Sequence, residues 1–243
     1  MNFILLILAI LYLFCTAFSG YRAIKKLDTF PIPEAQRIHR YRFSLGWNLC
    51  SLLFVFIIVW SSPITFLEIG FRSPVFSGAH PILYRAVLIV CCLLTALFLY
   101  QILTFLISPS YRKNTAESLQ QRFQAGGQYE KAVDSLIPRT SREKRWFFLT
   151  SLAAGVCEET VFRGFCFYLL QAVLPLEPIL TSIVVGFSFG FAHFYQGAKG
   201  IFKTALLGTL FGLLFSATGS LFFCIPLHFL FDFSSAFLYS QEQ

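Results

Sequence analysis

Charged residues are scarce in this chain. They make up 13% of its 243 residues, whereas a soluble domain usually contains about 25%. Hydrophobic residues account for 56% of the chain and aromatic residues for 18%. This balance excludes a soluble globular enzyme and indicates a protein that crosses the membrane several times.

The cysteines do not form a metal-binding pattern. All seven lie in or beside apolar stretches, and none belongs to a CxxC pair, so we interpret them as small buried hydrophobic residues. The His-Glu-x-x-His motif of zinc proteases is absent, and so is a pair of aspartates within the apolar stretches. Site-2-type metalloproteases and presenilin-type aspartyl proteases are therefore excluded.

Alternation of apolar and polar residues, which is the pattern of a membrane β-barrel, is missing as well. A membrane-spanning helix needs about 20 apolar residues, and backbone groups within lipid must be hydrogen-bonded inside the protein. The sequence therefore predicts an all-α fold, a polytopic transmembrane helical bundle of about seven spans. The predicted spans are 2–19, 44–62, 82–107, 146–171, 178–196, 202–217 and 220–239.

The net charge of +7 comes from two basic loops, so no nucleic-acid partner is expected. Because basic loops stay on the cytoplasmic side of a membrane, we expect the amino terminus outside and the carboxyl terminus in the cytoplasm. The basic residues of the two loops are Arg22, Lys25, Lys26, Arg37, Arg40 and Arg42, and Arg112, Lys113, Arg122, Lys131, Arg139, Arg142, Lys144 and Arg145.

Three regions are predicted along the chain. Residues 1–107 form N-terminal transmembrane scaffold spans, 108–145 a cytoplasmic basic loop, and 146–240 a catalytic transmembrane core. The loop is predicted to contain two short amphipathic helices separated by a Gly-Gly pair. We interpret it as a solvated connector, with a docking surface for a substrate or partner as the alternative. Thr140-x-x-Glu143 predicts a capping box at the start of the fourth span.

Six ionisable residues fall deep inside the predicted spans of the last 100 residues. A charged side chain at the centre of a bilayer costs about 2.5–3.5 kcal/mol on insertion scales, and such residues usually have a function. They belong to the fourth, fifth and seventh spans, which we expect to converge on one cavity. The six residues are Glu158, Glu159, Arg163, His193, His228 and Asp232.

Helical spacing indicates different tasks for the two adjacent glutamates. Glu159 and Arg163 are four residues apart and share a helix face, so we interpret them as a structural ion pair. Glu158 points about 100° away around the helix axis. Phe162 stands four residues after Glu158, which leaves this carboxylate available as a general base.

The two deep histidines complete a possible water-binding set. His228 and Asp232 are four residues apart on one helix face, and Phe189 lies one turn before His193. Two imidazoles and the Glu158 carboxylate can bind and activate a water, with or without a zinc ion. Zinc and a metal-free glutamate mechanism are both left open by the sequence.

Three motifs follow one another along the last 100 residues: Glu-Glu-x-x-x-Arg at 158–163, Phe-x-x-x-His at 189–193 and His-x-x-x-Asp at 228–232. This ordered set, within residues 146–235, resembles the CPBP family of intramembrane proteases. That family contains the type II CAAX prenyl endopeptidases and the bacteriocin self-immunity (Abi) proteins. The resemblance implies an intramembrane endopeptidase of the bacterial inner (plasma) membrane, acting on a peptide or protein substrate that can itself be membrane-associated.

The resemblance also implies roles for individual residues. Glu158 and His193 would activate the attacking water, while His228 and its partner Asp232 would hold the oxyanion. The family often has asparagine where Asp232 stands. Because an ionised aspartate would repel an oxyanion, we expect Asp232 either to orient His228 or to be protonated. The expected supporting residues are Glu159, Arg163 and Phe189.

Three other functions stay open. A rhomboid-like serine protease could pair Ser188 with His228, because 186–190 match Gly-x-Ser-x-Gly. That motif normally needs a strand–turn–helix elbow, whereas small residues in a span favour close helix packing. Buried carboxylates and histidines also build proton-coupled transporters, although the chain shows no internal repeat. The third alternative is a non-catalytic membrane scaffold.

Overall fold

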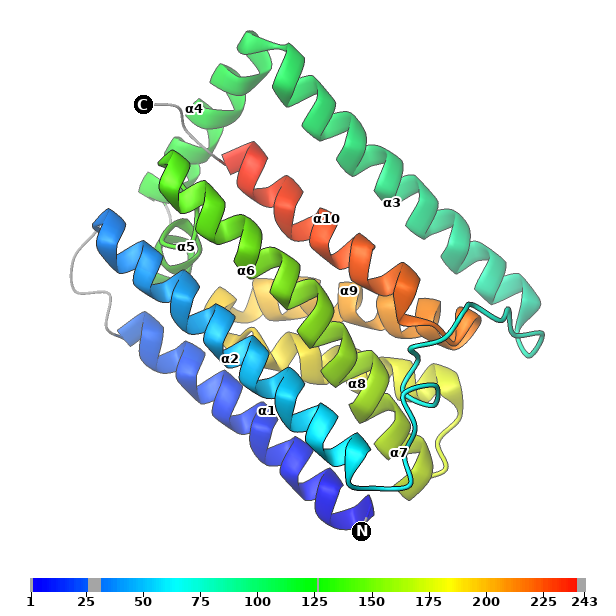
Figure 1. Ribbon diagram of the computed structural model, residues 1–243. Helices are drawn as coiled ribbons and strands as arrows, with labels where there is room; N and C mark the ends of the chain where they lie inside the picture. Colours follow the sequence, from blue (N-terminus) through cyan, green and yellow to red (C-terminus); the bar gives the residue numbers. More distant parts are fainter. Residues whose placement is uncertain (1, 26–31, 126, 240–243) are drawn as a thin grey trace.

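The computed structural model describes residues 2–25, 32–125 and 127–239, and these ranges contain helices but no β-strand. The all-α prediction is therefore confirmed. In Figure 1 a set of long helices runs lengthwise through the molecule, with the start of the first and the end of the last at opposite ends. These are α1 (Asn2–Lys25), α2 (Glu34–Trp60), α3 (Pro81–Ile107), α6 (Ser141–Glu159) and α10 (Leu221–Tyr239).

The apolar stretches predicted as spans lie almost entirely within helical segments of the structure. Three segments are long and apolar enough to cross a membrane: Glu34–Trp60, Pro81–Ile107 and Phe194–Thr218. Three shorter apolar helices accompany them, Ile7–Phe18, Pro178–Ala192 and Leu221–Ser234. The chain is an integral membrane protein, and a bundle of about seven spans is compatible with this architecture.

The basic loop contains the two short helices that the sequence predicts, α4 (Pro109–Ala125) and α5 (Gln128–Asp134). The capping box that follows is also confirmed. Thr140 Oγ1 accepts from Glu143 N at 3.2 Å, and Glu143 Oε2 accepts from Thr140 N at 3.0 Å. The second oxygen of Glu143 accepts from Arg37 Nε at 2.6 Å. This buried ion pair joins the start of α2 to the start of α6.

The helix that carries the glutamates changes its winding immediately after them. α6 ends at Glu159, a π-helix η1 follows over Thr160–Cys166, and α7 (Phe167–Val173) completes the run. All seven residues of η1 are buried. The predicted span 146–171 thus lies in one helical run with a π segment, which is a feature that frequently marks functional sites.

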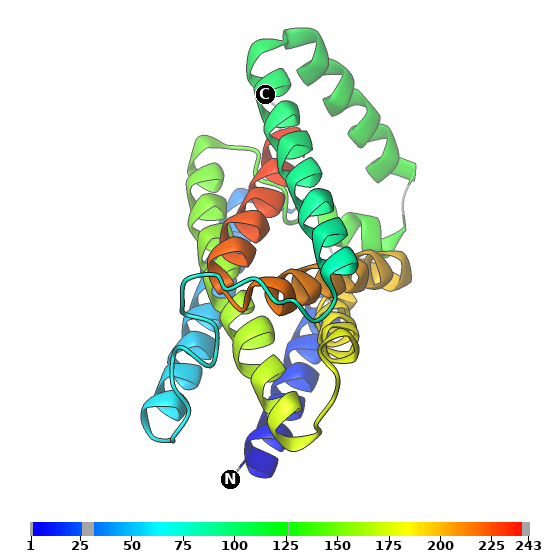
Figure 2. The same cartoon turned by 90° about the vertical axis from the view of Figure 1, so that its right-hand side faces the viewer.

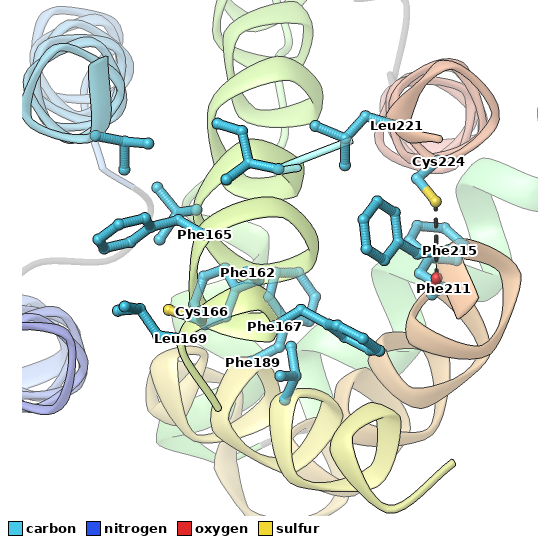
Figure 3. Packing of buried hydrophobic residues seen from close by; sticks show 14 of the residues in the cluster. Phe162, Phe165, Cys166, Phe167, Leu169, Phe189, Phe211, Phe215, Leu221 and Cys224 are labelled. Atoms are coloured by element: carbon cyan, nitrogen blue, oxygen red, sulfur yellow. Dashed lines mark hydrogen bonds between the residues drawn. The ribbon is translucent and has the colours of Figure 1, made fainter. Parts of the chain in front are cut away.

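The hydrophobic core surrounds η1. Phe162 meets Phe189 of α8 (Pro178–Ala192) edge-on, with 5.0 Å between ring centroids. Figure 3 shows these rings together with Phe211 and Phe215, and the thiol of Cys224, which donates to the Phe211 carbonyl oxygen at 3.6 Å. Aromatic side chains from η1, α8 and α9 (Gly197–Thr218) therefore pack directly beneath the segment that carries Glu158.

Helices α8 and α9 approach each other closely, and Figure 2 shows α9 crossing the direction of α6 and α10. A methyl group on Gly190 would lie 2.6 Å from the Ile201 carbonyl oxygen, so glycine is required there. The predicted span 178–196 is corrected: α8 ends at Ala192, and a 3₁₀ turn η2 (Phe194–Gln196) follows His193. His193 therefore lies at a helix end, because the chain must turn there to enter α9.

The loop between α2 and α3 holds the connection between α9 and α10 in place. Val75 N donates to the Thr218 carbonyl oxygen at 2.8 Å, and Leu221 N donates to that of Gly70 at 3.0 Å. Gly70 has a φ of 90°, a conformation that suits glycine because it lacks a Cβ. These contacts fix the position at which α10 begins, and hence the position of His228 seven residues later.

Candidate active site

The four predicted catalytic residues line one cavity of about 740 Å³. They are Glu158 from α6, His193 from the end of α8, and His228 and Asp232 from α10. The predicted convergence of the fourth, fifth and seventh spans is therefore confirmed. Glu158, His193 and His228 follow one another at intervals of 35 positions in the sequence. They come together because α8 and α10 both pack against the helical run that carries the glutamates.

Glu158 faces both histidines. Its Oε2 atom lies 4.0 Å from His193 Nε2 and 4.0 Å from His228 Nε2. This oxygen is buried and makes no hydrogen bond to any residue that the structure describes, while the side chain as a whole is 18% exposed. A separation of 4.0 Å is too long for a direct hydrogen bond. A water molecule can instead bridge the carboxylate oxygen and the imidazole nitrogens.

Both histidines turn the same ring nitrogen toward Glu158. His193 Nδ1 lies 2.9 Å from the Phe189 carbonyl oxygen, and His228 Nδ1 lies 2.6 Å from Glu159 Oε1. Carbonyl and carboxylate oxygens can only accept, so the proton on each Nδ1 is assigned from these contacts. Each ring then presents Nε2 to the cavity, in the orientation that a water-binding site needs.

The predicted ion pair of Glu159 and Arg163 is confirmed. Arg163 Nη1 donates to Glu159 Oε1 at 2.8 Å, and both side chains are 0% exposed. Arg163 Nη2 also donates to the Gly208 carbonyl oxygen at 3.0 Å, and its guanidinium carbon lies 4.4 Å from the Phe189 ring centre. The pair thus links the helix of the glutamates to α8 and α9.

Phe189 packs against both imidazoles. Its ring centroid lies 4.6 Å from that of His193 and 5.8 Å from that of His228. The phenyl ring therefore packs against the buried guanidinium and against both imidazoles. This contact gives Phe189 the supporting place that the sequence predicts.

Asp232 does not take the position expected of it. Its Oδ2 lies 3.8 Å from His228 Nε2, beyond hydrogen-bonding distance. The orienting hydrogen bond of His228 comes instead from Glu159 on the neighbouring helix. Four-residue spacing places Asp232 and His228 on one face, but the ring turns its Nδ1 away from Asp232 toward the buried carboxylate.

Ser188 has no base beside it among the described contacts. Its hydroxyl donates to the Val184 carbonyl oxygen at 2.9 Å, one turn earlier in the same helix. His228 Nδ1 is occupied by Glu159, and its Nε2 faces Glu158 and Asp232. The serine hydroxyl is therefore bonded within its own helix and not to a catalytic base.

The residues that can hold a metal are Glu158, His193 and His228. One carboxylate and two imidazoles form a known catalytic zinc set, and the hydrogen-bonded Nδ1 atoms are typical of metal-ligating histidines. The 4.0 Å separations exceed the roughly 3.3–3.5 Å between ligands of a tetrahedral zinc. Within the described residues no cluster has ready-made ligand geometry. The donor types fit zinc, and their spacing is wider than ligation requires.

Two residues near the site were missed by sequence reasoning. Tyr195 lines the cavity, and its ring centroid lies 5.8 Å from that of His193. Asn48 of α2 lies beside the Glu158 carboxylate and is 4% exposed. Neither is ionised at neutral pH, so a search for charged residues passed over them. A polar amide within an apolar span was the signal that could have revealed Asn48.

Residues 141–234 match the sequence model of a family described as type II CAAX prenyl endopeptidase Rce1-like. This segment belongs to the CPBP/CAAX protease family. The match extends from the start of α6 into α10 and includes every residue of the three motifs. The match supports, in general terms, an intramembrane endopeptidase of the CAAX type. Searches of curated proteins and of solved structures found no match.

Proposed function

We propose that the chain hydrolyses a peptide bond with a water held between Glu158 and the two histidines. One observation carries the proposal: three helices bring one carboxylate and two imidazoles to the same cavity. The carboxylate oxygen lies 4.0 Å from each imidazole Nε2 atom. A site with an open space between a base and its partners suits general-base hydrolysis. Glu158 is the base, and His193 accepts from the same water through Nε2.

The steps balance within this set of residues. Glu158 removes a proton from the water, whose oxygen forms a bond to the peptide carbonyl carbon. His228 carrying both ring protons can donate from Nε2 to the resulting oxyanion, while Nδ1 remains bonded to Glu159. Glu158 then gives its proton to the leaving nitrogen and the C–N bond breaks, which leaves a carboxylic acid and an amine; the proton of the acid passes to the amine, so a carboxylate and an ammonium group are released.

Asp232 contributes through its position beside His228. At 3.8 Å from Nε2, its carboxylate favours the protonated imidazole electrostatically. This role differs from holding the oxyanion directly, which a negative charge would oppose. A zinc ion held by Glu158, His193 and His228 would polarise the peptide carbonyl, and addition of a chelator to the purified protein tests that contribution.

The cavity supports a substrate that approaches from the side of the basic loops. Besides the site residues, its lining includes Arg40, Tyr129 and Lys199, which lie in or near the two basic loops or at the start of α9. We infer that this side is cytoplasmic, with the amino terminus outside and the carboxyl terminus inside, in a bacterial inner membrane. The proposed substrate is a segment of a membrane-associated peptide or protein.

Comparative membrane proteomics tests the function. A strain that produces the chain is compared with one that produces Glu158→Gln, which keeps the side-chain size and removes its basicity. New peptide termini that depend on Glu158 are expected only in the first strain. Identical sets of termini at equal protein levels would contradict the proposal.

A further inference from the structure

Buried polar atoms without a partner are concentrated around the active site. Among the described residues, five buried side-chain nitrogen and oxygen atoms make no hydrogen bond. Three belong to Glu158, Glu159 and Arg163, and the other two to Trp47 and Asn48 of α2. Such atoms are few in folded proteins and each requires an explanation. Glu158 Oε2 is explained by the water of the proposed mechanism, whereas the atoms on α2 are not explained by it.

Asn48 is the more informative of the two α2 residues. Its side chain is 4% exposed and lies beside Glu158, and its Nδ2 is the atom that lacks an acceptor. An unsatisfied buried donor costs about 1–3 kcal/mol. Leucine has nearly the same size and is favourable within a membrane helix. The structure therefore places a costly amide of α2 beside the proposed base.

A purely structural role does not account for this amide. Asparagine in a membrane helix often joins two helices by a hydrogen bond across their interface. Here Nδ2 makes no hydrogen bond to any residue in the described ranges, so it does not serve that purpose. Ser51, the other buried polar residue in this part of α2, donates to the Trp47 carbonyl oxygen at 2.8 Å within its own helix.

We propose that Asn48 is a positioning residue of the active site, whose Nδ2–H donates to the Glu158 carboxylate and holds it toward His193 and His228 during catalysis. The inference rests on the proposed function of Glu158. It extends the site beyond residues 141–234 and gives α2, predicted as scaffold, a part in the chemistry. Glu158 would then be fixed from one side by the amide while its other side faces the reacting water.

The test compares four variants of the full chain in detergent: Asn48→Leu, Asn48→Gln, Asn48→Asp and Ser51→Ala. Asn48→Leu removes the donor at equal size, and Asn48→Asp replaces the donor with a second carboxylate. Ser51→Ala is the matched control, because it removes a buried polar group from the same helix. Yield and thermal unfolding are measured first, and kcat and KM are then determined with a peptide identified by the proteomic comparison.

A hydrogen bond to a charged group corresponds to a rate factor of about 10–100. We expect Asn48→Leu to fold at wild-type yield and to lose about 10- to 100-fold in kcat with little change in KM. Asn48→Asp should lose more, because like charges oppose each other, and Asn48→Gln should recover part of the activity. Ser51→Ala should match the wild type.

The outcomes separate this inference from the proposed function. If Glu158→Gln is inactive while Asn48→Leu keeps the wild-type kcat, Asn48 does not position Glu158 and only the further inference is overturned. If Asn48→Leu merely lowers the folded fraction, with kcat per folded molecule unchanged, the amide is structural and the inference is again wrong. Retained cleavage by Glu158→Gln would overturn the proposed function itself.

Discussion

Removal of Arg163 should damage both the stability and the chemistry of this protein. Its guanidinium is 0% exposed and bonded to Glu159 and to the Gly208 carbonyl oxygen. Removal of one partner of a buried ion pair usually costs about 3–5 kcal/mol, because the other charge is left without compensation. For a chain of this length about 2–4 °C of melting temperature correspond to each kcal/mol, so Arg163→Ala should lower it by about 6–20 °C.

A second buried ion pair provides the control. Arg37 donates to Glu143 at 2.6 Å, far along α6 from the glutamates. After Arg37→Ala, Glu143 would still accept from Arg139 N at 2.6 Å and from Thr140 N at 3.0 Å. Arg37→Ala should therefore lower the melting temperature less than Arg163→Ala does and leave kcat per folded molecule unchanged.

The assay combines thermal unfolding of the purified protein in detergent with cleavage measured well below each midpoint. Without Arg163, Glu159 keeps only its bond to His228 among the described contacts. The carboxylate that orients the His228 ring is then no longer held in place by the guanidinium. Arg163→Ala should thus lower kcat even for molecules that remain folded. An unchanged melting temperature together with full activity would refute the assigned pairing.

Asp232→Asn should keep activity within about tenfold of the wild type, because Asp232 lies 3.8 Å from His228 Nε2 and makes no hydrogen bond to it; a loss as large as that of His228→Ala in the same kinetic assay would show that the charge is essential. Gly190→Ala should lower the free energy of unfolding by about 1–3 kcal/mol, because the added methyl would lie 2.6 Å from a carbonyl oxygen. Its yield and melting temperature should fall accordingly. Gly46→Ala is its control, because nothing lies within 4 Å of a methyl group there, and equal effects of the two alanines would contradict the close packing of α8 and α9.

Helical spacing in the sequence predicted the main features of the site. The pairing of Glu159 with Arg163 follows from four-residue spacing alone, because one helix supplies both side chains. The convergence of Glu158, His193 and His228 follows from the cost of charges in lipid, which requires deep polar groups to face one another. The seven apolar stretches likewise predicted helices, since no other element satisfies the backbone there.

The spacing of residues along the sequence could not predict contacts between different helices. His228 is oriented by Glu159, 69 positions earlier, and not by Asp232 on its own helix. The π segment after Glu159 leaves no trace in apolar periodicity, because all its residues are buried. Asn48 approaches Glu158 only through the packing of α2 on α6, which depends on helix rotation and depth.

The central claim is that Glu158, and no serine, activates the nucleophile. Cleavage of one peptide by purified Glu158→Gln and Ser188→Ala proteins in detergent tests it most directly. We expect Glu158→Gln to fold normally and to lose cleavage by about 10²–10⁴-fold, with Ser188→Ala close to the wild-type rate. Retained cleavage by Glu158→Gln together with loss in Ser188→Ala would contradict the account and assign the reaction to a serine protease.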